Sequence, residues 1–138
     1  MFKIIHKLKV SDIMHHPVIC TEPDNPADEV ADKLAHKRIS GMPVVTDDHR
    51  VVGIISERDL LMAIRQDKNL STTPVSAVMR HNPITIDKNA SLIAAIKALT
   101  DHEIMRLPVV ENGKLVGIIT RHDILKRVVM QVPGFMEI

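Results

Sequence analysis

The sequence predicts an α+β fold that is made of two copies of one β-α-β-β-α unit. Three segments recur in the same order at a spacing of 64 or 65 residues, and internal repetition of this kind indicates a duplicated structural unit. The change in spacing falls between two turn-like stretches, where a duplicated fold tolerates a difference in length. The three pairs are Val10–Met14 (VSDIM) and Val75–Met79 (VSAVM), Ile39–Val45 (ISGMPVV) and Ile104–Val110 (IMRLPVV), and Val51–Leu61 (VVGIISERDLL) and Leu115–Leu125 (LVGIITRHDIL).

The first helix of each repeat is predicted from apolar spacing. An extended stretch follows Pro17 in one repeat and Pro83 in the other, and a helical pattern comes next. In the first repeat Asn25 is expected to cap the helix, with Pro26 at its first position. The apolar residues follow the i, i+3, i+4, i+7 spacing of a helix that buries one face. They are Ala27, Val30, Ala31, Leu34 and Ala35, and in the second repeat Leu92, Ala95, Ile96 and Leu99.

A hairpin and a second helix complete each repeat. Asn112-Gly113 lies between two apolar runs and predicts a tight hairpin turn. The final helices are expected to begin at Ser56 and Thr120. The predicted boundaries are an N-terminal helix or arm at 1–9, the first repeat at 10–65, a polar linker at 66–74, the second repeat at 75–130, and a C-terminal tail at 131–138 that docks or frays.

The chain has 138 residues, too few for either repeat to bury a secure core alone. We therefore expect the repeats to pack sheet to sheet about a pseudo-twofold axis and to leave a groove on each side. A net charge of +1 argues against nucleic acid as a partner. The single cysteine fits a reducing compartment, and no apolar run is long enough for a membrane span, so a cytoplasmic location is expected.

Two interpretations fit the repeated S/T-x-x-D motif, which is Ser56 to Asp59 and Thr120 to Asp123. In the first, hydroxyl and carboxylate form a capping box at a helix start. In the second, the helix N-terminus and the hydroxyl receive a phosphate, while the carboxylate accepts from the two hydroxyls of a ribose. The two interpretations are compatible, because a capping serine can also touch a ligand.

The duplicated pattern resembles a tandem pair of CBS domains, also called a Bateman module, over about Val10 to Val129. The matching positions are Pro43 and Pro108, Gly53 and Gly117, and Asp59 and Asp123. The resemblance implies a regulatory protein without catalysis of its own. It also implies an adenosine-containing ligand (AMP, ADP or ATP, or S-adenosylmethionine), a homodimeric disc, and an output through a separate protein effector.

The resemblance further implies two ligand clefts, each built from both repeats. In the first, Asp59 is expected to hold ribose, Ser56 a phosphate, and two arginines further phosphates, so that di- or triphosphates are favoured. The second has less fixed positive charge and is expected to take a monophosphate, a nucleoside-like ligand, or nothing. The first set is Ile54, Ser56, Arg58, Asp59, Ile84, Thr85, Met105 and Arg106; the second is Ile118, Thr120, His122, Asp123, Val18, Ile19, Ile39 and Ser40.

Two other functions compete with this one. A ligand-independent dimerisation module would use S/T-x-x-D only as caps and would pair through the final helices. The adjacent histidines His15 and His16 do not have the spacing of metal ligands and are expected to be exposed loop residues. The sequence shows no nucleophile or acid–base motif, so catalysis is not expected. The predicted dimer seam is Leu60, Leu61, Ile64, Ile124, Leu125, Val128 and Val129.

Overall fold

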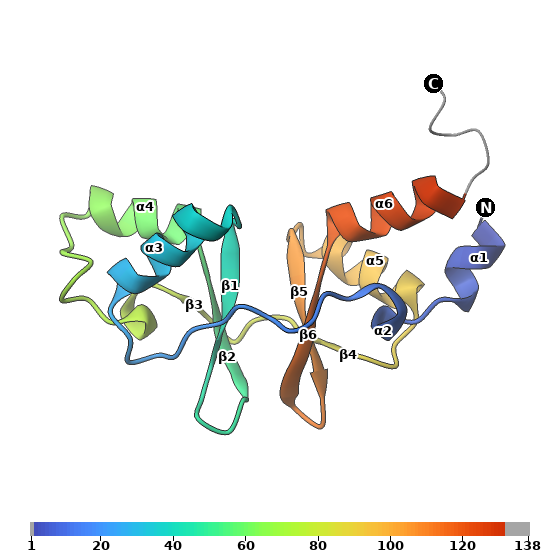
Figure 1. Ribbon diagram of the computed structural model, residues 1–138, viewed down its shortest axis with the longest axis horizontal. Helices are drawn as coiled ribbons and strands as arrows, with labels where there is room; N and C mark the ends of the chain where they lie inside the picture. Colours follow the sequence, from blue (N-terminus) through green and yellow to red (C-terminus); the bar gives the residue numbers. More distant parts are fainter. Residues whose placement is uncertain (1, 132–138) are drawn as a thin grey trace. The chain divides into compact units, whose positions relative to one another are not determined.

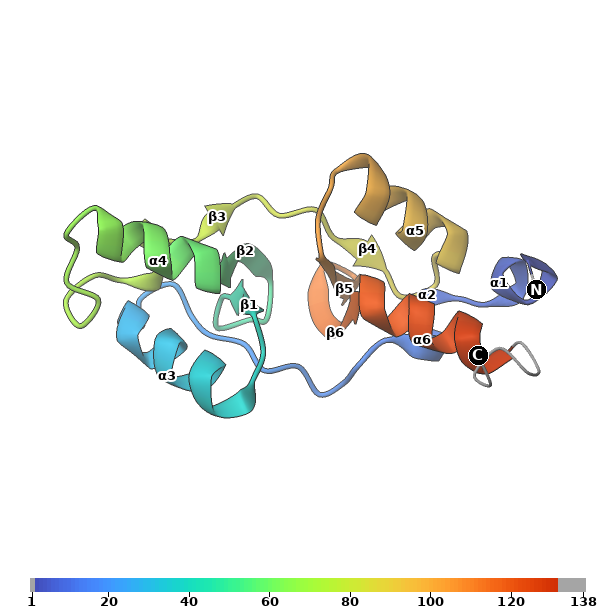
Figure 2. The ribbon, with the colours of Figure 1, turned by 90° about the horizontal axis from the view of Figure 1, so that it is seen from above.

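The computed structural model describes residues 2–131 and confirms the α+β class, with two small three-stranded sheets and their helices (Figure 1; Figure 2). The chain folds as two compact units that do not coincide with the repeats. One unit contains Ile19–Pro83; the other contains the described residues up to Val18 and those from Ile84 onward. The predicted C-terminal tail lies outside the described residues, apart from residue 131.

The unit formed by Ile19–Pro83 contains a sheet of strand order β1-β2-β3, with β1 antiparallel to β2 and β2 antiparallel to β3. The stretch after Pro17 contributes only a parallel bridge, from Thr21 to Val44. The elements are α3 (Ala27–Lys37), β1 (Gly41–Val45), β2 (Val51–Ser56), α4 (Glu57–Arg65), the 3₁₀ turn η1 (Val75–Ala77) and β3 (Arg80–His81).

The other unit has the strand order β4-β5-β6, in which β4 is parallel to β5 and β5 is antiparallel to β6. The predicted hairpin is confirmed: Asn112 and Gly113 have φ of 53° and 79°, as a tight turn with two left-handed residues requires. The elements are α1 (Phe2–Lys7), α2 (Val10–Ile13), β4 (Ile86–Asp87), α5 (Leu92–Asp101), β5 (Arg106–Glu111), β6 (Lys114–Thr120) and α6 (Arg121–Gln131).

Each sheet also receives a leading segment from the other repeat, which the sequence did not predict. Strand β3 precedes the first helix of the second repeat, yet it pairs with β2 of the first. In the same way, His15 of the first repeat forms a bridge to Ile118 in β6 of the second. The repeats are therefore interleaved, and each compact unit needs residues from both.

The start of α3 differs from the prediction. Its N-cap is Pro26, not Asn25. The side-chain amide of Asn25 instead donates to the Thr21 hydroxyl at 3.1 Å. No side-chain cap is needed, because Ala27 N donates to the Thr73 carbonyl and the next amide donates to Leu70. The predicted linker at 66–74 therefore packs on the first repeat through its backbone.

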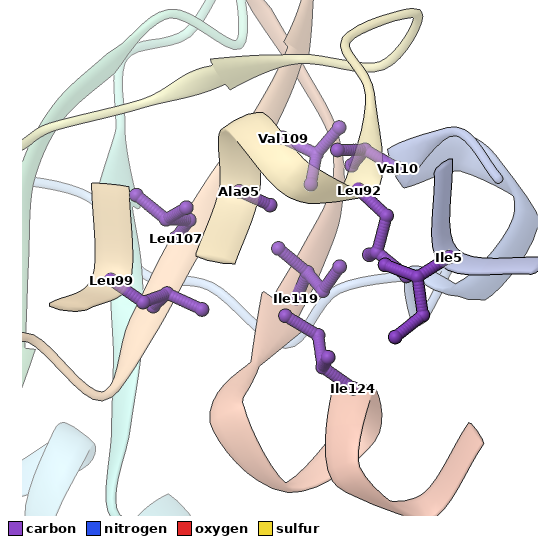
Figure 3. Packing of buried hydrophobic residues seen from close by; sticks show 9 residues of the cluster. All are labelled: Ile5, Val10, Leu92, Ala95, Leu99, Leu107, Val109, Ile119 and Ile124. Atoms are coloured by element: carbon purple, nitrogen blue, oxygen red, sulfur yellow. The ribbon is translucent and has the colours of Figure 1, made fainter. Parts of the chain in front are cut away.

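Apolar residues form one buried cluster in each unit. The stripe predicted for α3 buries Ala27, Val30 and Leu34 but leaves Ala35 exposed. Figure 3 shows the cluster of the second unit, where α5 lies against the β5–β6 hairpin and α6. Its buried members are Ile5, Val10, Leu92, Ala95, Leu99, Leu107, Val109, Ile119 and Ile124.

Candidate functional site

Ser56 and Asp59 form a complete capping box at the start of α4. Asp59 N donates to Ser56 Oγ at 3.3 Å, and Ser56 N donates to Asp59 Oδ2 at 2.9 Å. Ser56 Oγ also lies 2.9 Å from the same Oδ2, so this oxygen accepts two bonds from Ser56. The capping interpretation is therefore confirmed here, and the box leaves Oδ1 as the carboxylate oxygen for other partners.

Thr120 and Asp123 make the equivalent contacts at the start of α6. Thr120 N donates to Asp123 Oδ2 at 2.9 Å, and Asp123 N donates to Thr120 Oγ1 at 3.1 Å. Both carboxylates are only slightly exposed, with side-chain exposures of 10% for Asp59 and 11% for Asp123. The two acids therefore repeat the same arrangement on two different helices.

A basic side chain from the interleaved segment lies beside the outer oxygen of each acid. Arg80 Nε in β3 is 3.6 Å from Asp59 Oδ1, and His15 Nε2 is 2.5 Å from Asp123 Oδ1. Sequence reasoning missed both residues. Their equivalent positions, directly after Met14 and Met79 of the repeated segment, were the available signal.

The backbone before each hairpin also engages the helix start. Glu57 N donates to the Ser40 carbonyl at 2.9 Å, and Arg121 N donates to the Met105 carbonyl at 3.1 Å. The first helical amides therefore already have protein partners. A phosphate bound near these helix starts would receive its hydrogen bonds more from side chains than from the amides of Glu57 and Arg121.

The predicted site residues are divided between the two units. The unit with Asp59 holds Ile54, Ser56 and Arg58 of the first predicted cleft, and Ile19, Ile39 and Ser40 of the second. The unit with Asp123 holds Ile118, Thr120, His122 and Val18 of the second predicted cleft, and Ile84, Thr85, Met105 and Arg106 of the first. Each predicted cleft takes residues from both units, so its composition stays a prediction.

The accessibility of these residues suits contact with a ligand in several cases. Arg58, Thr85, His122 and Met105 are exposed, the last at 52%. Ile54 and Ile118 are half-buried on their strands, next to the capping boxes that follow them. The apolar side chains and the acids are thus both partly open within their own units.

Within the described part of the chain, no group of three or more histidine, cysteine, aspartate or glutamate residues is placed to hold a metal ion. Among residues 2–131, no helix combines the length and the apolar character needed to cross a membrane. Burial raises the pKa of the Cys20 thiol, while nearby Lys33 opposes the shift.

Fold and sequence together define a pair of CBS repeats. The sequence model of the CBS domain family matches residues 10–66 and 75–130. The chain belongs to the CBS domain family, as the duplicated motif had predicted.

Related sequences differ in their overall length. The chain is 33% identical to an uncharacterised protein of Methanopyrus kandleri over 124 residues, which are 88% of this chain and 63% of that protein. It is 40% identical to inosine-5'-monophosphate dehydrogenase of Mycobacterium tuberculosis over 111 residues, which are 80% of this chain but 20% of the enzyme. The chain therefore spans less than two thirds of either relative.

Solved structures match nearly the whole chain. The CBS domain pair of protein MJ0100, in complex with 5'-methylthioadenosine and S-adenosyl-L-methionine, is 26% identical with a TM-score of 0.81; the match covers 91% of this chain and 98% of that one. CBSX2 in complex with AMP is 28% identical with a TM-score of 0.80, covering 89% and 97%.

Proposed function

We propose that this protein is a non-catalytic regulatory CBS pair that binds an adenosine-containing ligand at each of its two acids. AMP, ADP and ATP are the first candidates, and S-adenosylmethionine is the alternative. The observation that carries the proposal is the pair of partly buried carboxylates, Asp59 and Asp123, each with one oxygen left over by its capping box. The ligands of the two similar structures, AMP and two adenosyl compounds, support it.

The acids suit a sugar because of how their oxygens are used. A carboxylate has about four acceptor positions, and the capping box of Asp59 takes two of them at Oδ2. Oδ1 is left for a ribose hydroxyl. The helix cap and the ligand therefore use different oxygens of one side chain.

The two sites differ in nearby positive charge. Arg58 follows Ser56 by two residues, whereas His122 is at the equivalent place after Thr120. Arginine stays charged at every physiological pH and can bind phosphate through two donors. We therefore propose that the site of Asp59 prefers di- or triphosphates and that the site of Asp123 prefers a monophosphate or a nucleoside.

The remaining expectations extend the same proposal. The output passes through a separate effector protein, and the protein acts in the cytoplasm. The effector is what the resemblance to CBS pairs implies, and the location fits a sequence whose single cysteine is Cys20.

Thermal unfolding with a ligand panel tests the proposal. A ligand at a hundredfold excess over its dissociation constant stabilises the native state by about 2.7 kcal/mol, which raises the melting temperature by several degrees. The panel is AMP, ADP, ATP, S-adenosylmethionine, NAD and cyclic dinucleotides. Asp59→Asn should weaken binding at one site, while Asp47→Asn, an exposed aspartate on the first hairpin, should not. The absence of a shift with every adenosine compound would refute the proposal.

A second candidate function is a dimerisation module, because α4 and α6 carry exposed apolar side chains. Leu61 and Ile64 are 65% and 53% exposed, and Leu125 is 63% exposed. Two residues of the predicted seam were wrong: Leu60 and Ile124 are buried within the cores of their own units. Light scattering of Leu61→Glu and wild type, with and without nucleotide, tests this candidate. A ligand-indifferent dimer that Leu61→Glu dissociates supports it, and a wild-type monomer under all conditions excludes it.

A further inference from the structure

The two acids have different basic neighbours at equivalent positions. Arg80 of β3 lies beside Asp59, whereas His15 lies beside Asp123. The two basic side chains are 60% and 67% exposed, while the acids they contact are almost covered. The basic side chain is therefore the half of each pair that solvent can reach, and the acid is the covered half.

We infer that Arg80 and His15 determine how the two sites differ, because each competes with a ribose hydroxyl for Oδ1 of the acid. The inference rests on the proposed function and assigns its regulation. Arginine keeps its charge, so Asp59 always has a charged competitor. Histidine is the side chain type whose charge changes between pH 5 and 8, so the contact at Asp123 is the one of the two that pH can weaken.

The capping box directs this competition to one oxygen of each acid. In both repeats Oδ2 accepts the amide of the preceding hydroxyl residue, Ser56 or Thr120. We infer that a hydroxyl of the ligand approaches Oδ1, the oxygen that the helix cap does not use. At Asp123 this oxygen is 2.5 Å from His15 Nε2, and a bond to a charged imidazole is about twice as strong as a neutral one.

Loss of the histidine charge frees the acid in two ways. A neutral imidazole holds one proton on two nitrogens, so Nε2 is no longer always a donor. Any bond that remains lacks the attraction between two opposite charges and is weaker. Ligand affinity at Asp123 should therefore rise with pH, whereas affinity at Asp59 should not.

The elements around His15 carry other charged or titratable groups, whose effects must be separated from that of His15 in the test. They lie on its own segment, on α2, on β6, or on α6, which begins beside the pair. Only two of them are histidines. These groups are His16, Asp12, Lys114, Arg121, His122, Lys126 and Arg127.

Adenosine is the probe, because it is uncharged between pH 6 and 8 and brings no phosphate to either site. Asp59→Asn isolates the site of Asp123, and Asp123→Asn isolates the site of Asp59; the amide oxygen of asparagine can still accept the cap bond. Calorimetry at about pH 6 and about pH 8 then measures each site alone. In Asp59→Asn, adenosine should bind about fivefold more tightly at the higher pH, as expected when an exposed ion pair loses one of its two charges. In Asp123→Asn, the affinity should stay constant.

Substitution of the cations completes the test. In the Asp59→Asn background, His15→Ala should abolish the pH dependence and give the high-pH affinity at both pH values. In the Asp123→Asn background, Arg80→His should introduce the pH dependence. In the Asp59→Asn background, His16→Gln is the matched control and should leave the pH dependence unchanged. His122→Gln should preserve the ratio of the adenosine affinities at the two pH values.

The outcomes separate this inference from the proposed function. Adenosine binding that is independent of pH, or that keeps its pH dependence after His15→Ala, overturns the inference and leaves the proposed function standing. A pH dependence that disappears with His16→Gln or His122→Gln also overturns it. If adenosine binds neither site at either pH, the proposed function fails, and the inference fails with it.

Discussion

Gly53→Ala tests whether the interleaved strand approaches β2 as closely as the structure describes. Gly53 pairs with His81, and an added β-carbon would lie 2.4 Å from Met79 Sδ and 2.9 Å from the Arg80 carbonyl oxygen. The thioether can move aside, because it ends a flexible side chain. The carbonyl belongs to the β2–β3 pairing and can move only if β3 moves with it.

Overpacking of this kind costs about 1–3 kcal/mol. For a chain of 138 residues, with an unfolding entropy of about 2 cal/mol/K per residue, the melting temperature should fall by roughly 3–10 °C. Gly117→Ala is the matched variant in the other unit. Its β-carbon would lie 2.5 Å from Met14 Sδ and 3.1 Å from the His15 carbonyl oxygen, so its effect should be smaller.

Calorimetric melting of the two variants beside the wild type measures the effect. The reasoning is refuted if Gly53→Ala melts within about 1 °C of the wild type, because a shift that small lies below the range expected for overpacking. It is also refuted if Gly117→Ala is clearly the more damaging change. Either result would mean that the interleaved segment can retreat from the strand at little cost.

Two further predictions concern the helix cap and the cysteine. Ser56→Ala removes the acceptor of Asp59 N and should lower the free energy of unfolding by about 1 kcal/mol in urea titration, whereas an unchanged midpoint would mean that the cap contributes nothing. Burial raises the pKa of Cys20, so at neutral pH less of it is thiolate and it should react with a disulfide reagent more slowly in the native protein than in urea. Equal rates in the two states would contradict the role of burial.

The elements that the sequence predicted correctly depend on residues close together in the chain. The turn at Asn112-Gly113 follows from two residues, and each capping box follows from a hydroxyl and an acid three positions apart. Helical apolar spacing likewise involves only a few turns. Local chemistry of this kind can be read from a single sequence.

The contacts that the sequence did not predict join residues that are far apart along the chain. His15 and Asp123 are 108 positions apart, and nothing in either local segment specifies the other. The failure at Asn25 has the same origin, because distant carbonyls from the 66–74 segment satisfy the start of α3. A strand glycine such as Gly53 was the available hint, since glycine inside a strand often marks a close approach of another backbone.

The interleaving gives each acid two structural roles. Asp59 accepts a capping bond at the start of α4 through Oδ2, and its Oδ1 lies beside Arg80 of β3. Strand β3 itself pairs with β2 through only two register positions. In the proposed function, a sugar that takes Oδ1 therefore removes a partner from a short strand contributed by the other repeat. The effect of the ligand is then expected first in β3, not in α4, whose cap uses the other oxygen. In the proposed function, the repeated hydroxyl and acid therefore have separate uses: Oδ2 maintains the helix cap, and Oδ1 binds either the interleaved segment or the ligand.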